Sequence, residues 1–256
     1  MQAPDELARL VETSLEELAL HSALGELQEP VRYALGGGGK RIRPVICLAT
    51  TEAAGGAVER ALPAALGLEL VHTFSLVHDD LPAMDDDDER RGRPSLHVAF
   101  GEGVALLAGD ALLAEALHIA LGDGRSEPVR ELAEAALGMI GGQYLDITRA
   151  DVALEDLHRL KTGRLFAAAV GLGLWAAEVP TAAQVPWRAF GEELGVLFQA
   201  VDDVLDGDGY ASELGADGAR GVAVDAARRA HDRLGAIEAD TSVLGEIVDS
   251  LAVRTA

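Results

Sequence analysis

Apolar residues recur along the chain with the spacing of buried and half-buried α-helices. Residues 4–20 mix leucine and valine with acids in the manner of an amphipathic opening helix. Residues 64–77 are apolar almost all round, which is typical of a helix buried in a core. Further helices are predicted at residues 31–35, 103–121, 129–147, 157–174, 222–234 and 243–253. No strand-like alternation persists and no linker interrupts the pattern, so the chain is predicted to be an all-α, single-domain protein over residues 1–256.

Composition and charge exclude several classes of partner. The formal net charge of −22 argues against nucleic acid and for a soluble protein that repels anionic surfaces. No apolar run reaches the roughly 18 residues that a membrane span requires, so no integral membrane segment is expected. The polar, acidic N-terminus does not resemble a signal peptide, and a cytoplasmic enzyme is the simplest expectation. The single cysteine, Cys47, lies in an apolar stretch and is expected to be a small buried side chain.

An acidic run follows the predicted core helix. Seven carboxylates fall within eleven positions, from Asp79 to Glu89, and such a run is either fully solvated or shared with cations. Asp79 and Asp80 stand at the C-terminal end of a helix, where the macrodipole disfavours negative charge. Pro82 then ends the helix, and Asp85 follows closely enough to share an ion with Asp79. The context therefore favours a cation site over a solvated loop.

A second acidic group supports a metal. Gln199, Asp202, Asp203 and Asp206 stand at offsets 0, 3, 4 and 7 in an apolar context, which places them on one face of a helix. Acids on the apolar face of a buried helix need partners. Oxygen ligands without cysteine favour a hard cation, Mg²⁺ or Mn²⁺, which usually shares its remaining positions with water and substrate phosphates.

A glycine run, residues 36–39, precedes a basic cluster. It is not a Walker A loop, because Ala34 and Arg41 stand where that pattern needs glycine and serine or threonine. Alone it is read equally well as a flexible turn or as a phosphate cradle. Lys40, Arg41 and Arg43 just before Pro44 favour an anion site at the start of the next helix.

Lysine usage points the same way. Lys40 and Lys161 are the only lysines in a chain with nineteen arginines. Each therefore suggests a position that needs a compact ammonium group.

These motifs together resemble those of the trans-isoprenyl diphosphate synthases, the polyprenyl synthetase family, and most closely the bacterial farnesyl and geranylgeranyl diphosphate synthases. DDxxxxD with RRGxP, a distant FQxxDDxxD, and an upstream GGK-R-x-R-P occur in the family's order between about Gly36 and Asp206. The resemblance implies an all-α bundle around a central cavity, the isoprenoid synthase fold, and a homodimer. It implies a short-chain prenyltransferase that joins isopentenyl diphosphate to an allylic diphosphate with Mg²⁺.

The resemblance also assigns roles to individual residues. The implied metal ligands are Asp79, Asp80, Asp85 and Asp202. The allylic diphosphate is expected to be bound by Arg90, Lys161 and Thr162, which with Asp79, Asp85 and Asp202 form the implied catalytic set. Isopentenyl diphosphate is expected at Lys40, Arg43, His72 and Arg91. Gln199 is implied in substrate binding, and Gln143 and Asp146 in lining the cavity and supporting the metal site.

The resemblance also implies that Phe74 limits the length of the product. A large aromatic residue five positions before Asp79, with two extra residues near Pro82 inside the acidic motif, is similar to the bacterial farnesyl diphosphate type. Farnesyl diphosphate is therefore the expected product, and geranylgeranyl diphosphate is the alternative.

Beyond Asp206 the chain departs from the family. The lysines of the usual LGK and GKxT segments are absent, and Arg220 is the nearest candidate to replace one of them. A class I terpene cyclase remains an alternative, although its second acidic motif is normally less rich in aspartate. The missing lysines also keep open a non-catalytic subunit of a heteromeric synthase. A plain helical interaction protein leaves the paired motifs unexplained.

Overall fold

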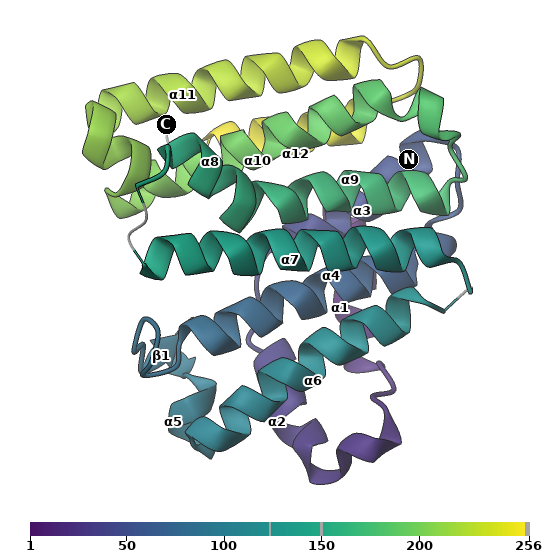
Figure 1. Ribbon diagram of the computed structural model, residues 1–256. Coiled ribbons are helices and arrows are strands. Elements are labelled where there is room, and N and C mark those ends of the chain that lie inside the picture. Colours follow the sequence, from purple (N-terminus) through teal and green to yellow (C-terminus); the bar gives the residue numbers. More distant parts are fainter. Residues whose placement is uncertain (123, 149–150, 254–256) are drawn as a thin grey trace.

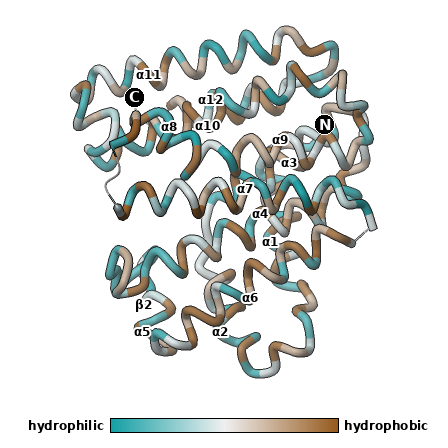
Figure 2. Tube along the Cα trace, in the orientation of Figure 1, coloured by the Kyte–Doolittle hydropathy of each residue, from teal (hydrophilic) through white to brown (hydrophobic). Residues whose placement is uncertain are grey.

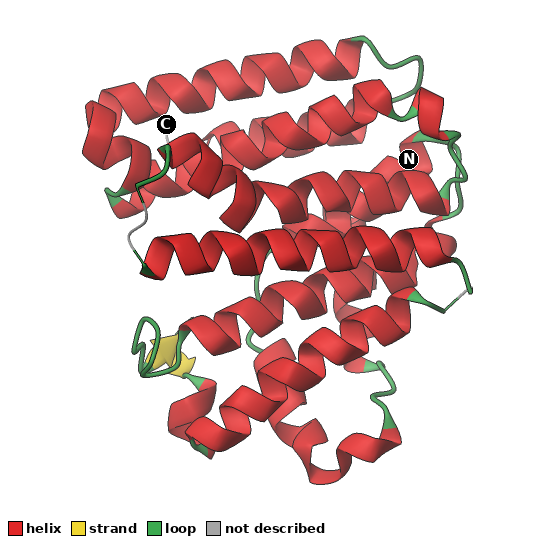
Figure 3. Ribbon diagram, in the orientation of Figure 1, coloured by secondary structure: helices red, strands yellow, loops and turns green. Residues whose placement is uncertain are grey.

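The apolar stretches of the sequence fold into helices that lie side by side (Figures 1 and 3). The computed structural model describes residues 1–122, 124–148 and 151–253. Within these ranges the strands β1 (Glu89–Arg90) and β2 (Arg93–Pro94) pair as a short antiparallel hairpin. The α-helices are α1 (Pro4–Glu16), α2 (Gln28–Leu35), α3 (Ile42–Ala53), α4 (Val58–Asp79), α5 (Leu96–Phe100), α6 (Glu102–Ala120), α7 (Ser126–Ile147), α8 (Leu154–His158), α9 (Arg164–Ala176), α10 (Val185–Asp206), α11 (Gly209–Gly235) and α12 (Ser242–Ala252). The predicted all-α class is confirmed.

Three helices form the centre of the bundle. α3, α4 and α9 pack against one another, and their buried residues lie on every side of each helix. Helices α1, α10 and α12 are amphipathic, and Figure 2 shows brown and teal segments alternating along α10. In α1 the buried stripe is Leu7, Val11 and Leu15, at the helical spacing of four residues. Periodicity therefore fixes which face of an outer helix meets the core.

Several boundaries differ from the predicted ones for identifiable reasons. The core helix was predicted over residues 64–77, after Pro63, and proline in a helix interior removes an N–H group. It begins at Val58 instead, and burial of Val58 and Ala61 outweighs that loss. The stretch predicted at residues 157–174 is interrupted by η2 (Arg159–Gly163), a single π-helical turn between α8 and α9. Sequence periodicity does not detect such a turn.

The C-terminal helices begin earlier than predicted. Gly207 takes a left-handed conformation at the end of α10, and α11 starts two residues later. α11 bends at Gly215, which also has a positive φ, and then packs back along α10. Residues 209–221 are therefore helical, and the connection after the second acidic motif is short.

Two helices meet the length and composition expected of a membrane span, contrary to the estimate from the sequence. They are α4 and α6, whose most apolar windows are 67% and 44% buried in the bundle. Core helices of globular proteins meet the same criterion.

The polar motifs gather at one end of the bundle. In Figure 1 the C-terminal ends of α4, α7 and α10 lie at the left, beside the β1–β2 hairpin and α8. This end carries the candidate site.

Candidate active site

Two cavities open at this end of the bundle and share part of their lining. The first, about 550 Å³, is called here the apolar cavity; it is lined by Asp79, Lys161 and Thr162 and by apolar residues that include Phe74, Leu113, Met139, Ile140, Ile147 and Leu165. The second, about 490 Å³, is the cationic cavity; it is lined by Lys40, Arg43, His72, Arg90, Arg91 and Asp202, among others. Arg43, His72 and Thr162 line both. The two acidic motifs therefore face adjoining spaces.

Arg43 is a buried cation with an unpartnered donor atom. Its residue exposure is 8%, and its Nε lacks a hydrogen-bond partner. The guanidinium lies 4.5 Å from the ring centroid of Phe166 and 5.3 Å from that of Phe198, and these two rings contact each other. Burial lowers the pKa of Arg43 to about 10, against the opposing attraction of Glu69 and Asp202. A buried charge in this state favours an incoming anion.

His72 lies between the two cavities as a neutral imidazole. Burial lowers its pKa well below the ordinary value, and the nearby charges of Arg43 and Arg91 lower it further. A neutral imidazole can donate one hydrogen bond to a phosphate oxygen without adding charge.

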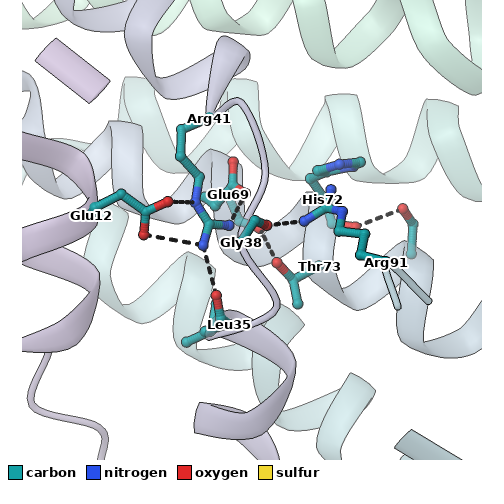
Figure 4. A network of polar contacts seen from close by, with 9 residues as sticks. Glu12, Leu35, Gly38, Arg41, Glu69, His72, Thr73 and Arg91 are labelled. Carbon is teal, nitrogen blue, oxygen red and sulfur yellow. Dashed lines mark hydrogen bonds and ion pairs between the residues drawn. The ribbon is translucent and has the colours of Figure 1, made fainter. Parts of the chain in front are cut away.

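Arg41 is structural, although it belongs to the same basic cluster. It pairs with Glu69 at 2.5 Å and with Glu12 at 2.8 Å, and it donates to the Leu35 carbonyl at 2.7 Å (Figure 4). Its left-handed backbone, with φ of 48°, begins the turn into α3. Glu12 comes from α1, so the opening helix helps to hold the segment that carries Lys40 and Arg43.

The glycine run positions Arg91. The Gly38 carbonyl accepts a hydrogen bond from Nη1 of Arg91 (Figure 4). Gly39 has a φ of 134°, and a Cβ there would lie 2.6 Å from the same Nη1 atom. A side chain at Gly39 would therefore displace Arg91 from the cationic cavity.

Asp79 carries an unfavourable negative charge. Burial raises its pKa to about 6; the charges of Asp85 and Asp80 raise it as well, while Lys161 and Arg90 oppose the shift. The N–H of Asp85 donates to the Asp79 carbonyl at 2.9 Å, which keeps the exposed Asp85 next to Asp79. A bound cation would relieve this repulsion.

Asp80 and Asp203 differ from the acids that precede them. Asp80 is 3% exposed and accepts two hydrogen bonds from Arg90, one of them from Nε at 2.8 Å. Asp203 is 1% exposed and accepts from the Gln199 side chain at 2.6 Å and from the Tyr210 N–H at 2.8 Å. In each Asp-Asp pair, the first acid lines a cavity and the second is held in a buried structural contact.

Lys161 lies on the π-helical turn η2, and its position depends on glycines of neighbouring helices. A Cβ at Gly142 of α7 would lie 2.5 Å from the Lys161 backbone nitrogen, and a Cβ at Gly195 of α10 would lie 2.7 Å from the Cα of Gly163. Isolated π-turns occur frequently at functional sites. The ammonium pairs with Asp146 at 2.5 Å. In the Gly-Gly-Gln-x-x-Asp motif, Gly142 therefore leaves space for the turn and Asp146 holds the Lys161 side chain.

Substitution of Gly142 by alanine should destabilise the protein by about 1–3 kcal/mol, because the methyl group meets backbone atoms of η2 and not a flexible side chain. Gly141 is the matched control, since a Cβ there meets no atom within 4 Å. Gly141→Ala should be neutral or more stable by up to about 1 kcal/mol. Urea unfolding of both variants measures the difference, and equal stabilities would show that α7 does not pack closely against the Lys161 turn.

The donor set fits a hard divalent cation that arrives with substrate phosphates. Among the described residues, no group of three or more His, Cys, Asp or Glu side chains is gathered closely enough to hold an ion alone. Asp79 and Asp85 on one side and Asp202 on the other supply only oxygen donors. Mg²⁺ typically retains several water or phosphate ligands beside one or two carboxylates, so this set suits Mg²⁺ or Mn²⁺.

The remaining predicted residues have definite positions. Lys40 is exposed at the cationic cavity, Arg90 lines the same cavity while bound to Asp80, and Gln143 lines the apolar cavity. The side chain of Gln199 is engaged by Asp203. The sequence interpretation missed Glu69, which lies in the core helix, and the glycine contacts around η2.

Comparison with known proteins agrees with this arrangement. The sequence model of the polyprenyl synthetase family matches residues 25–220. Geranylgeranyl diphosphate synthase of Cyanophora paradoxa is 44% identical over 195 residues, covering 70% of this chain and 65% of that protein. Dimethylallyltranstransferase of Fischerella ambigua is 41% identical over 223 residues, covering 79% of this chain and 64% of that protein. The chain thus spans less than two thirds of the length of these curated relatives.

Solved structures match nearly the whole chain. The geranyltransferase of Legionella pneumophila has a TM-score of 0.86 and 31% identity, covering 98% of this chain and 96% of that one. The FPP/GFPP synthase of Zymomonas mobilis has a TM-score of 0.85 and 30% identity, covering 97% of both chains. With two acidic motifs on adjoining cavities and a family match over most of its length, the chain belongs to the polyprenyl synthetase family.

Proposed function

We propose that the protein is a short-chain trans-prenyltransferase that condenses isopentenyl diphosphate with an allylic diphosphate in the head-to-tail (1′-4) manner. The observation that carries the proposal is Arg43, a buried guanidinium with an unpartnered Nε in a cavity also lined by Lys40, His72 and Arg91. A diphosphate is the small anion best suited to several converging cations. Isopentenyl diphosphate is assigned to this cationic cavity.

The allylic diphosphate is assigned to the region of Asp79, Lys161 and Thr162, with its hydrocarbon chain in the apolar cavity. Mg²⁺, when held by Asp79, Asp85 and Asp202, would neutralise charge on the leaving diphosphate. Lys161 and Arg90 are placed to add to that neutralisation. The apolar lining excludes water, which would otherwise trap an allylic cation.

The proposed reaction forms one carbon–carbon bond. The C1–O bond of the allylic substrate breaks, and its diphosphate leaves with the electron pair. The double bond of isopentenyl diphosphate attacks C1 through C4. A proton lost from C2 restores the double bond, and the departing diphosphate accepts it. His72 and Arg91 would hold the attacking molecule in reach of C1.

Geranylgeranyl diphosphate is the product best supported by the curated relatives, because several of them carry the name geranylgeranyl diphosphate synthase. Farnesyl diphosphate is the second candidate. It is favoured by Phe74, a large aromatic residue whose buried ring lines the apolar cavity.

Chain-length analysis decides between these products. Purified protein is incubated with Mg²⁺, isopentenyl diphosphate and, separately, the C5, C10 and C15 allylic diphosphates. Consumption of isopentenyl diphosphate is expected with at least one starter. Release of diphosphate from an allylic substrate in the absence of isopentenyl diphosphate would indicate a cyclase instead.

Phe74→Ala should lengthen the main product by at least one isoprene unit, because removal of the ring deepens the apolar cavity. Leu165→Val, on another wall of the same cavity, is a control for a small loss of volume elsewhere. Chromatography of the dephosphorylated products gives the lengths. An unchanged distribution in Phe74→Ala would remove Phe74 as the determinant of product length.

A homodimer is proposed from the outer face of α6 and α7. Large apolar side chains that line neither cavity are exposed there: Leu106, Leu107 and Leu137. A second copy of this chain, related by a two-fold axis, is the proposed occupant, because an isologous contact would bury the same apolar face of both chains. Sedimentation velocity should give a dimer for the wild type and a monomer for Leu137→Asp. A monomeric wild type at micromolar concentration would contradict this assignment.

A further inference from the structure

Phe74 does not line the apolar cavity alone. His78 lies one helical turn further along α4, on the same face of the helix, and also lines the cavity. The two ring centroids are 4.9 Å apart at an interplanar angle of 70°, an edge-to-face contact. Such contacts have a preferred geometry, so the orientation of one ring constrains the other.

His78 is in turn fixed by α6. Its Nε2 lies 3.0 Å from the Leu106 carbonyl oxygen. A carbonyl oxygen can only accept, so Nε2 carries the proton and donates it. The imidazole is therefore held in one tautomer and one orientation by a neighbouring helix.

Gly109 provides the space for this contact. A Cβ at Gly109 would overlap with the Nε2 and Cδ2 atoms of His78. Gly109 has an ordinary helical backbone, so the glycine is required by the close approach of the imidazole and not by backbone conformation. Alanine would be the better helix former at this position.

We propose that His78, seated in the notch at Gly109, is a positioning residue that fixes the Phe74 ring and thereby sets product length. This inference rests on the proposed prenyl transfer. Phe74 has two side-chain torsions and faces a cavity that must admit a growing hydrocarbon chain. Without the imidazole behind it, the ring can adopt a second rotamer and deepen the cavity. The length limit therefore belongs to the Phe74–His78–Gly109 contact and not to Phe74 alone.

We expect substitutions at His78 and at Gly109 to change the ratio of longer to shorter product in opposite directions. His78→Ala removes the support and should raise the ratio of longer to shorter product on the order of tenfold. His78→Gln keeps a side-chain N–H donor for the Leu106 carbonyl but has no ring to contact Phe74, so it should restore the wild-type ratio only in part. Gly109→Ala displaces the imidazole from α6 toward the cavity and should lower the ratio. Gly103→Ala, on the same helix with open space around its Cβ, is the control.

A double-mutant cycle distinguishes two roles for His78: it can act by fixing the Phe74 ring, or it can contact the growing hydrocarbon chain directly as part of the cavity wall. If His78 acts through Phe74, Phe74→Ala combined with His78→Ala should give the same product distribution as Phe74→Ala alone. A further lengthening in the double variant would overturn the positioning role. An unchanged distribution in His78→Ala would overturn it as well.

The readout is a product ratio, so a slower variant still gives an answer. His78→Ala adds no atoms to the core, which makes it the variant of choice if Gly109→Ala does not fold. Absence of prenyl transfer in the wild type would refute the proposed function itself. Normal wild-type transfer with unshifted His78 variants would refute only this inference.

Discussion

Arg43→Met should lose about 10³-fold in kcat/KM for isopentenyl diphosphate while its free energy of unfolding stays equal to that of the wild type or rises. The reason is that Arg43 is buried at a desolvation cost, with its Nε unpartnered. Methionine fills a similar volume against Phe166 and Phe198 without a charge. Steady-state kinetics and urea unfolding measure the two effects on the same preparation.

Arg41→Met is the matched control, two residues away. Arg41 is also buried, but it is paired with Glu69 and Glu12. Its removal leaves the Glu69 carboxylate buried without its closest counter-charge, which should cost about 3–5 kcal/mol of stability. A destabilised Arg43→Met with retained turnover would show that this guanidinium serves the fold and not a ligand.

Asp79→Asn should lower turnover by at least about 10³-fold with the fold intact. The asparagine side chain has nearly the same shape, yet it cannot carry the charge that a divalent cation requires. Asp5→Asn is the control, because Asp5 is exposed on α1 and lines neither cavity. Mg²⁺-dependent product formation and the far-ultraviolet circular dichroism spectrum are the measurements. Undiminished turnover of Asp79→Asn would count against the first acidic motif as a metal site.

The same residue predicts a pH dependence of stability. The pKa of Asp79 is about 6 in the folded protein, above the ordinary value of 3.8. The folded state therefore binds this proton more tightly than the unfolded state, and its contribution to stability declines as pH rises from about 4 to about 6. Without added metal, Asp79→Asn should remove this decline, and Mg²⁺ should offset it in the wild type above pH 6. The measurement is urea unfolding of the wild type and of Asp79→Asn between about pH 4 and pH 6. If the pKa of Asp79 were not raised, the free energies of unfolding of the two proteins would change with pH in parallel.

Much of the fold could be predicted because its helices bury stripes with a clear 3.6-residue period. The α1 stripe of Leu7, Val11 and Leu15 is one example, and the continuous apolar run of α4 is another. The early start of α11 could not be predicted, because residues 209–221 lack a continuous apolar stripe and contain Gly215 and Gly218. Packing against α10 stabilises that segment instead.

The site was predictable at the level of motifs but not of individual orientations. Adjacent helical residues project in different directions, and the sequence does not say which of Asp79 and Asp80 faces the cavity. The same holds for Asp202 and Asp203. Arg41 and Arg43 also look alike in sequence, yet one is paired in the core and the Nε of the other has no hydrogen-bond partner. Such distinctions depend on partners from distant helices, such as Glu12 and Glu69.

The central claim is that the two adjoining cavities bind two diphosphates around one group of metal ions. A crystal structure with Mn²⁺, isopentenyl diphosphate and an unreactive thiolodiphosphate analogue of the allylic substrate tests it most directly. We expect anomalous density for manganese between Asp79 and Asp202, one diphosphate against Lys161 and the other against Arg43. Manganese at neither acid, or a cationic cavity without diphosphate at saturating ligand, would contradict the account.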